Sequence, residues 1–554
     1  MHACLLIPEI VKLIFTNFHV YDTDEYSVNF VDLYSRLATQ RYVAGRHSLA
    51  ALSRVCRSFK DIALDALWVK LDSLEPLFAC LPRDLWTMTD DRKLLIQRPV
   101  TEADWSVFEQ YASRVRILGH ADFDLFGGID AEFVYAMIGF CSQSLLVPNL
   151  RTLCCKGYRY PDVFHSYMRY LLGPNLIYLF VVSPTEGFLS SAMPSVLSDL
   201  DRYSPQLEVI EFLGPHLMCP RVSELALCGL THLRKANLIF SSQEDLSWIS
   251  RIVGLQELKI VLAGIFPPLR SQFRTSYLEK LVIHSFDLTT SGSSVAGWVV
   301  PCRQLQLIPT FTESAVAVER ALRMLDQRLL FNVLEHILLD ALVFGPNRDH
   351  IDNAFTLQTF TPLMRFSSLK EVDLSTFCMS LLDDDDLGSI VKSWPHLECL
   401  YLGTKCFWQM PPKITFRGLV TLLATCPDLR NLGLIFDTTK VDSPTAETLG
   451  RGVSNTNITH FHVGCSPIEQ PLQVAVSLSA VLPCLGEFIV ESWLVKPGGQ
   501  DGPDRQARNA KWGEVLKHIG HTLIKQESNA TVKTRDVTSW LTRKVARRER
   551  LLRC

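Results

Sequence analysis

One hydrophobic pattern, x-Leu-x-x-Leu-x-Leu, recurs along most of the chain, usually after a proline or a small residue. Copies include "PNLRTLCC" (148–155), "PNLIYLFV" (174–181), "PHLECLYL" (395–402) and "PDLRNLGL" (427–434), and the series continues to 490. With a weaker copy, "CRQLQL" at 302–307, the spacing is roughly 22 to 35 residues. In Leu-x-Leu both leucines point to one side of a short strand. The pattern therefore predicts one strand with one buried face in every repeat.

The segments between these strands predict helices that return the chain to the next strand. Two of them, "DLGSIVKSWPHL" and "GLVTLLATCPDL", place their apolar residues on one helical face, and Pro395 and Pro427 then end each helix before the next strand. The apolar residues are Leu387, Ile390, Val391 and Trp394 in the first segment and Leu419, Val420, Leu422 and Leu423 in the second. Stacked parallel strands with helical returns share a continuous core, so we expect an α/β solenoid.

Over residues 111–495 the chain resembles leucine-rich repeat proteins. The asparagine that often follows the strand in regular arrays is missing, because Lys405 and Asp437 stand in the corresponding places. The repeat lengths are also uneven. The resemblance therefore implies an irregular leucine-rich-repeat solenoid.

The amino-terminal segment predicts helices with more apolar surface than one neighbour can cover. "LLIPEIVKLIF" starts a helix at Pro8 and Glu9 and is apolar on most sides. "LAALSRVCRSFKDIALDALW" (49–68) predicts a helical hairpin with a break at Ser58, Lys60 and Asp61. The hairpin can cover one side of the first helix, which leaves another side for a partner.

These two stretches together resemble the F-box, the three-helix module with which substrate receptors dock on the Skp-type adaptor of cullin-based ubiquitin ligases. Followed by leucine-rich repeats, they resemble F-box proteins that are abundant in mushroom-forming fungi. The segment between them, about 19–48, is an insertion relative to the family. A module can tolerate it because the entropic cost of closing a loop grows slowly with the length of the loop. The resemblance implies that the residues at or supporting the adaptor interface are Pro8, Ile10, Ile14, Phe15, Val55, Cys56, Phe59 and Trp68.

The expected domain organisation has five parts. Residues 1–70 form the F-box-like helical module, 71–110 a linker and amino-terminal cap, and 111–495 the repeat solenoid. The polar, glycine-rich and proline-rich stretch 496–511 predicts a mobile loop, and 512–554 a helical basic tail. Such a tail is most often a solvated helix, although it also suits an acidic partner, an anionic membrane or a nuclear import receptor.

Residues between the inward leucines should form the binding face of the array. This face mixes charged, polar and aromatic groups with apolar ones, as protein-recognition surfaces do. The candidate residues for binding a protein substrate are Glu211, Lys259, Gln306, Asp373, Tyr401 and His462. The apolar members are Phe180, Val282, Leu338 and Ile489, some of which loops can cover.

Composition narrows the class of partner. A formal net charge of −3 over 554 residues gives no electrostatic footprint for nucleic acid or for an anionic membrane. The 16 cysteines lack zinc or disulfide spacings, which favours reduced thiols in the cytoplasm or the nucleus. The start of the chain does not read as a secretory signal, and no apolar run reaches the length of a membrane span.

Candidate chemistry is sparse. Asp383–Asp386 offers carboxylates that a hard cation would accept, but the run precedes a helix, and we favour a helix cap. Thr101 and Asp104 predict a capping box for a helix that leads into a strand near Arg114. No phosphate-binding loop, nucleophile elbow or zincin motif occurs. We therefore expect no enzyme activity, no cofactor and no metal.

Two functions follow from the sequence. The first is a substrate-recognition adaptor of a cullin-type ubiquitin ligase, with the Skp-type adaptor and cullin core as partners of the module and an unidentified protein substrate on the repeats. The second is a ubiquitin-independent repeat scaffold for protein interactions, whose amino-terminal helices only cap the solenoid.

Overall fold

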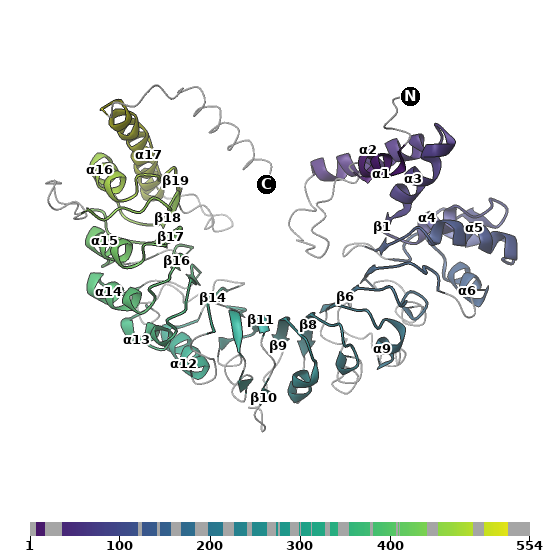
Figure 1. The fold of residues 1–554 in the computed structure, drawn as a ribbon, viewed down its shortest axis with the longest axis horizontal. Coiled ribbons are helices and arrows are strands. Elements are labelled where there is room, and N and C mark those ends of the chain that lie inside the picture. The colour runs from purple at the N-terminus through teal and green to yellow at the C-terminus, as the bar shows by residue number, and fades with distance from the viewer. Residues whose placement is uncertain are drawn as a thin grey trace. The chain divides into compact units, whose positions relative to one another are not determined.

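The computed structural model describes most of the chain. The described residues are 7–16, 36–119, 125–140, 145–156, 168–182, 198–213, 227–240, 246–262, 273–274, 278–288, 298–299, 301–311, 313–326, 333–341, 354–376, 380–405, 408, 410–439, 452–490 and 503–529. The chain divides into two compact units, and Figure 1 shows the helices and strands of each. The first unit comprises 1–286 with 293–301, and the second 287–292 with 302–554.

The first unit begins with helices and continues as a parallel sheet. Its described helices are α1 (Pro8–Thr16), α2 (Arg36–Leu52), α3 (Arg57–Trp68), α4 (Glu75–Ala79), α5 (Glu102–Ala112), α6 (Ala131–Phe140), α9 (Leu200–Tyr203) and the 3₁₀ helix η3 (Leu246–Arg251). The strands of the sheet pair in chain order and are β1 (Lys70–Leu71), β4 (Ile117–Leu118), β5 (Thr152–Lys156), β6 (Tyr178–Val182), β7 (Val209–Leu213), β8 (Lys235–Phe240), β9 (Glu257–Leu262) and β11 (Leu278–Ser285). Two small pairs accompany it: β2 (Trp86–Met88) with β3 (Leu94–Ile96), and β10 (Phe273–Arg274) with β12 (Trp298–Val299).

The second unit repeats a strand and a return helix. Its parallel strands also pair in chain order: β13 (Cys302–Pro309), β14 (His336–Leu339), β15 (Glu371–Leu374), β16 (Cys399–Leu402), β17 (Asn431–Leu434), β18 (His460–Gly464) and β19 (Glu487–Val490). The helices are α12 (Ala315–Asp326), α13 (Leu357–Phe360), the 3₁₀ helix η5 (Leu363–Arg365), α14 (Asp384–Lys392), α15 (Phe416–Thr425), α16 (Pro471–Val481) and α17 (Pro503–Asn529). Helices α12 to α16 lie on one face of this sheet (Figure 1).

The strands form because apolar residues alternate along them. In β9, Leu258, Ile260 and Leu262 are buried, while the residues between them are partly exposed. The buried side faces the return segments, and successive repeats share that core. Each unit therefore has the α/β fold of a leucine-rich-repeat solenoid, which confirms the predicted fold class.

The predicted helix caps are present. Asp383 accepts hydrogen bonds from the backbone N–H groups of Asp385 and Asp386 and closes a capping box at the start of α14. Thr101 and Asp104 form the capping box of α5, which leads into β4. The acidic run at 383–386 is therefore a helix start, as expected.

Asparagine side chains join neighbouring repeats at a place that the sequence analysis did not single out. Asn149 donates to the backbone carbonyl of Ser113, and Asn175 donates to that of Pro148. Asn455 is almost fully buried, donates to the carbonyl of Leu429 and accepts from the backbone N–H of Ile458. The asparagine that pairs with backbone groups of the neighbouring repeat thus precedes the strand instead of following it. The repeated "PNL" in the sequence carries this signal.

The amino-terminal hairpin has a different boundary from the predicted one. Helix α2 runs from Arg36 to Leu52, so part of the presumed insertion is helical, and the turn lies at 53–56. Helix α3 begins at Arg57, after Cys56 in an extended conformation, and continues through Ser58, Lys60 and Asp61 without a break. The predicted break was wrong because polar residues on the outer face of an amphipathic helix do not interrupt it.

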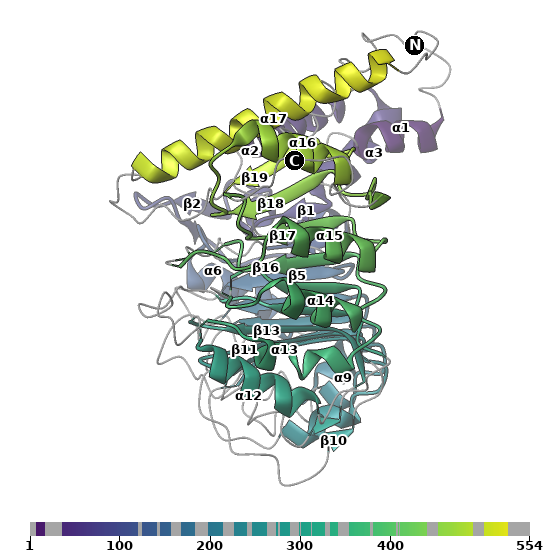
Figure 2. The ribbon, with the colours of Figure 1, turned by 90° about the vertical axis from the view of Figure 1, so that its left-hand side faces the viewer.

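The carboxy-terminal boundary also differs. Helix α17 starts at Pro503, within the stretch predicted as a loop, and lies beside α16 and β19 (Figure 2). Trp512, Val515 and Ile519 are buried at helical spacing, and the Trp512 ring packs 5.1 Å from that of Phe488. The helix covers the last repeat, and this burial stabilises residues whose composition alone predicts a loop. The basic residues of the predicted tail beyond 529 lie outside the described residues.

Candidate functional site

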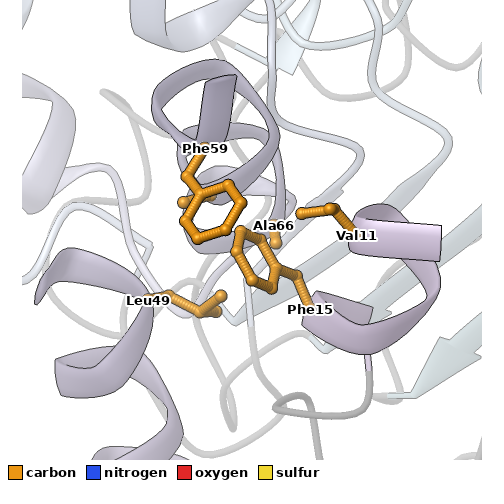
Figure 3. Packing of buried hydrophobic residues seen from close by; sticks show 6 residues of the cluster. Val11, Phe15, Leu49, Phe59 and Ala66 are labelled. Atoms are coloured by element: carbon orange, nitrogen blue, oxygen red, sulfur yellow. The ribbon is translucent and has the colours of Figure 1, made fainter. Parts of the chain in front are cut away.

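The first candidate site is the helical module of α1, α2 and α3. Its core is made by Val11 and Phe15 of α1, Leu49 of α2, and Phe59, Ala63 and Ala66 of α3 (Figure 3). The rings of Phe15 and Phe59 meet edge to face at 5.5 Å. Aromatic pairs of this geometry add to the stability that apolar burial provides. The three helices therefore form a packed unit of their own.

Helix α1 carries more apolar surface than this core uses. Val11 and Phe15 point into the module, whereas Ile7 and Ile14 are exposed and Ile10 is partly exposed. Residues three and four apart share a helix face, so Ile7, Ile10 and Ile14 form one stripe next to the buried one. Leu13, 67% exposed, widens it. We call Ile7, Ile10, Leu13 and Ile14 the α1 flank.

The residues assigned to adaptor docking fall into three groups. Pro8 and Ile14 of α1 and Val55, in the turn between α2 and α3, are exposed. Ile10 and Cys56 are partly buried, and Cys56 packs against the module core. Phe15, Phe59 and Trp68 are buried, but only Phe15 and Phe59 belong to the core of the module. Leu13 of α1 and Ile7, just before it, are also exposed and apolar, although the resemblance did not assign them to adaptor docking.

The module is tied to the first repeat. Trp68 at the end of α3 lies 4.8 Å from the Tyr111 ring of α5, and Val69 alone separates α3 from β1. Arg114, before β4, forms ion pairs with Asp61 and Asp65 of α3. These contacts tie α3 to α5 and to the residues just before β4.

The second candidate site is the strand face opposite the buried leucines. In the first unit, strand register places Phe180, Glu211, Asn237, Lys259 and Val282 in one row across β6, β7, β8, β9 and β11. In the second unit, the corresponding row contains Gln306, Leu338, Asp373, Tyr401, Gly433, His462 and Ile489. The candidate substrate-binding residues of each unit therefore lie in register on one face.

Glu211 is held by its neighbours in the first unit. The Tyr178 hydroxyl donates to Glu211 Oε1 at 2.9 Å, and Asn237 Nδ2 approaches Oε2 at 3.5 Å. Burial raises the pKa of Tyr178, and the Glu211 charge raises it further. Phe180 and Val282, predicted as outward apolar residues, are buried. This part of the row is therefore largely packed, and Lys259 remains partly exposed.

The second unit has a polar cluster around Gly433. Tyr401 leans across this glycine, because an added Cβ there would lie 2.2 Å from Tyr401 Cδ1. The Tyr401 ring approaches the His462 ring edge to face, at 6.4 Å. Asp373, the register partner of Tyr401 on β15, accepts a hydrogen bond from the Ser375 backbone N–H. Gln306, on β13, lies further along the same row.

A ladder of ion pairs borders the row in the second unit. Lys370 Nζ lies 2.8 Å and Arg303 Nε 3.1 Å from Glu335 Oε2, and these three residues lie at or just before consecutive strands. Both cations lower the pKa of Glu335, mainly through the Lys370 hydrogen bond. Arg430 and Glu398 continue the pairing at 3.7 Å. The alternating charges at or just before β13 to β17 are the sequence signal of this ladder.

One His, Glu and Cys combination lies on the strand face but lacks the features of a catalytic site. His336 Nδ1 is 2.9 Å from Glu371 Oε2, and Glu371 is next to Cys399 on β16. Burial raises the pKa of Cys399 well above its ordinary value, and the Glu371 charge raises it further, which opposes thiolate formation. Among the described residues no group of three His, Cys, Asp or Glu side chains is placed to hold a metal ion. In the same residues, no helix is both long and apolar enough to cross a membrane.

Comparison with known proteins gives structural likenesses only. No protein-family model and no curated protein sequence matches the chain. A leucine-rich-repeat internalin (InlF) from Listeria monocytogenes is similar in structure, with 13% identity and a TM-score of 0.36 over 66% of this chain and 91% of the internalin. The Rad7 and Elc1 complex of yeast is similar with 12% identity and a TM-score of 0.32, over 77% of this chain and 88% of that one. The fold assignment rests on strand order and register in each unit.

Proposed function

We propose that this protein is a substrate-recognition adaptor of a cullin-type ubiquitin ligase. The module of α1, α2 and α3 docks on the Skp-type adaptor, and the repeat strands bind a protein substrate. Binding both partners raises the effective concentration of one near the other, so the chain needs no catalytic residue of its own.

The α1 flank is the observation that carries this proposal. Exposed apolar residues that occur singly are ordinary, but a stripe of them on a helix whose neighbouring stripe already fills a core is typical of an interaction surface. Ile7, Leu13 and Ile14 are 45%, 67% and 39% exposed. The F-box resemblance of this segment assigns that surface to the Skp-type adaptor.

The second candidate function is a repeat scaffold whose module only caps the array. The Trp68–Tyr111 contact and the Arg114 ion pairs favour it, because they tie α3 to the first repeat. A module that only caps the array needs the contacts of α3 and does not need the α1 flank to bind a partner. The two functions therefore make different predictions for substitutions on α1.

The test is co-elution of the full chain with a purified Skp-type adaptor in gel filtration. We expect a complex with the unmodified chain and at least about a tenfold loss of affinity when Ile7→Asp and Ile14→Asp place two charges on the α1 flank. The matched control carries Val253→Asp and Leu472→Asp, two exposed apolar positions outside the module. This control should bind like the unmodified chain.

Thermal unfolding of each variant shows whether the substitutions leave the fold intact, as expected at exposed positions. Absence of a complex with the unmodified chain, or equal binding by the α1 variant, would exclude adaptor docking and leave the capping function.

A further inference from the structure

We propose that the strand face of β15 to β18 contains an anchoring subsite for an arginine side chain of the bound protein, formed by Asp373, Tyr401 and His462 around Gly433. The inference rests on the proposed role of the repeats as a receptor and specifies the chemistry that they recognise.

The three side chains share one face because their strands are in register. Asp373 pairs with Tyr401, Tyr401 with Gly433, and Gly433 with His462. Neighbouring strands lie about 4.8 Å apart, so the row is a continuous strip across four strands. The long stem of arginine spans one to two of these spacings, which lets an arginine that lies over β17 reach Asp373 on β15.

Gly433 gives the strip its flat aromatic platform. Any side chain at this position would meet the Tyr401 ring, since Cδ1 and Cε1 lie 2.2 Å and 2.9 Å from the place of a Cβ. The Cδ1–Cε1 side of the ring therefore lies over Gly433 on β17. Tyr401 is partly exposed. A guanidinium plane stacks on an aromatic ring more favourably than an ammonium does.

Asp373 supplies the negative charge beside that ring. Burial raises the pKa of this carboxyl group and Asp340 raises it further, while the Ser375 hydrogen bond and Lys405 act in the opposite direction. A partly buried carboxylate gains from a cation that brings its own hydrogen-bond donors, and arginine offers two in a planar fork. The charge and the platform thus favour the same ligand group.

His462 lies at the other end of the strip. The residue is 6% exposed, and its Nε2 atom has no hydrogen-bond partner within the described part of the chain. Burial lowers its pKa to about 4, and Lys405 contributes, so the ring is neutral near pH 7 and does not repel a cation.

Lys405 is the group that distinguishes arginine from an acidic ligand. Its charge acts on both Asp373 and His462. If the subsite binds arginine, Lys405 opposes the ligand and its removal strengthens binding. If it binds a carboxylate or a phosphate, Lys405 is the main attraction and its removal weakens binding.

The probe is a random dodecapeptide display library, selected on the immobilised full chain. We expect enriched peptides that share an arginine at one position. The synthetic consensus peptide, measured by fluorescence anisotropy, should lose at least about tenfold in affinity when its arginine becomes leucine or glutamate, and several-fold when it becomes lysine. Asp373→Asn should cause a loss of about tenfold, and Lys405→Gln a gain.

The matched control is Glu398→Gln, a carboxylate that belongs to the neighbouring ion-pair ladder, and it should leave affinity unchanged. Failure to enrich any sequence, enrichment of acidic peptides that Lys405→Gln weakens, or equal binding by Asp373→Asn would each overturn the proposal. Because the assay contains no Skp-type adaptor, its outcome is independent of whether the α1 flank docks.

Discussion

The Asp384 carboxylate of α14 accepts two hydrogen bonds of 2.7 Å from Thr415, one from the backbone N–H and one from the hydroxyl. Thr415 is the N-cap residue of α15, and its hydroxyl in turn accepts from the Arg417 N–H. The start of one return helix is therefore fixed by a side chain from the helix before it.

This contact predicts a large effect of Asp384→Ala. The substitution removes both bonds and leaves the partly buried Thr415 N–H without its partner, which should lower the free energy of unfolding by about 1 to 3 kcal/mol. Urea unfolding followed by circular dichroism measures it. Asp385→Ala is the control, since that carboxylate is 88% exposed and its pair with Arg417 should contribute less than about 1 kcal/mol. Equal shifts for the two variants would contradict the prediction.

The capping box of α5 predicts a pH dependence. Hydrogen bonds from Arg98 hold the pKa of the buried Asp104 carboxyl group well below its ordinary value. A depressed folded-state pKa stabilises the protein above the unfolded-state pKa of about 3.9, and this stabilisation is lost as the pH falls below that value. Arg98→Gln should therefore lower the melting temperature near pH 7 and have a smaller effect near pH 3. A difference that stays constant across this range would show that the pair is not responsible.

The contact between Tyr401 and Gly433 predicts a coupled pair of substitutions. Gly433→Ala alone should destabilise the second unit, because the new Cβ meets the Tyr401 ring. In a Tyr401→Ala background the same change should be neutral or stabilising by about 0.5 to 1 kcal/mol, since glycine is unfavourable within a strand. A double-mutant cycle of unfolding free energies measures the coupling, and additive effects would mean that the ring does not lie over the glycine.

The contacts of Trp512 should determine how stably the carboxy-terminal helix α17 packs on the last repeat. Its ring packs against Phe488 and its indole N–H donates to the Ser466 carbonyl at 3.0 Å. Trp512→Ala should cost about 3 to 5 kcal/mol locally and release α17 from the last repeat. Hydrogen exchange of residues 503–529 should increase strongly, whereas Glu514→Ala, at an exposed position of the same helix, should leave it unchanged. Slow exchange of α17 in the Trp512 variant would contradict the role of this residue.

The repeat strands could be predicted because their signal is local. Leu400 and Leu402 alternate with Tyr401, and that alternation fixes which side chains share a face. The same alternation in the neighbouring repeats assigns Asp373, Tyr401 and His462 to one face of the sheet. Helix α2 was harder, since "RLATQRYVAGRH" has no clean apolar stripe and its helical state depends on packing against α3.

The geometry of the candidate subsite could not be predicted in the same way. That a ring leans over Gly433, and that His462 Nε2 is buried without a partner, depends on distances between strands that are about 30 residues apart in the chain. Burial of Phe180 and Val282 likewise follows from what packs over the sheet, and periodicity within one strand does not reveal it.

A single residue, Val69, connects α3 to β1. Because this connection is so short, the helical module cannot reorient relative to the first strands as it could on a flexible glycine-rich linker. A protein bound to α1 would therefore have a fixed orientation relative to the first strands. Inserting a few flexible residues at Val69 would remove this fixed orientation without changing either binding surface.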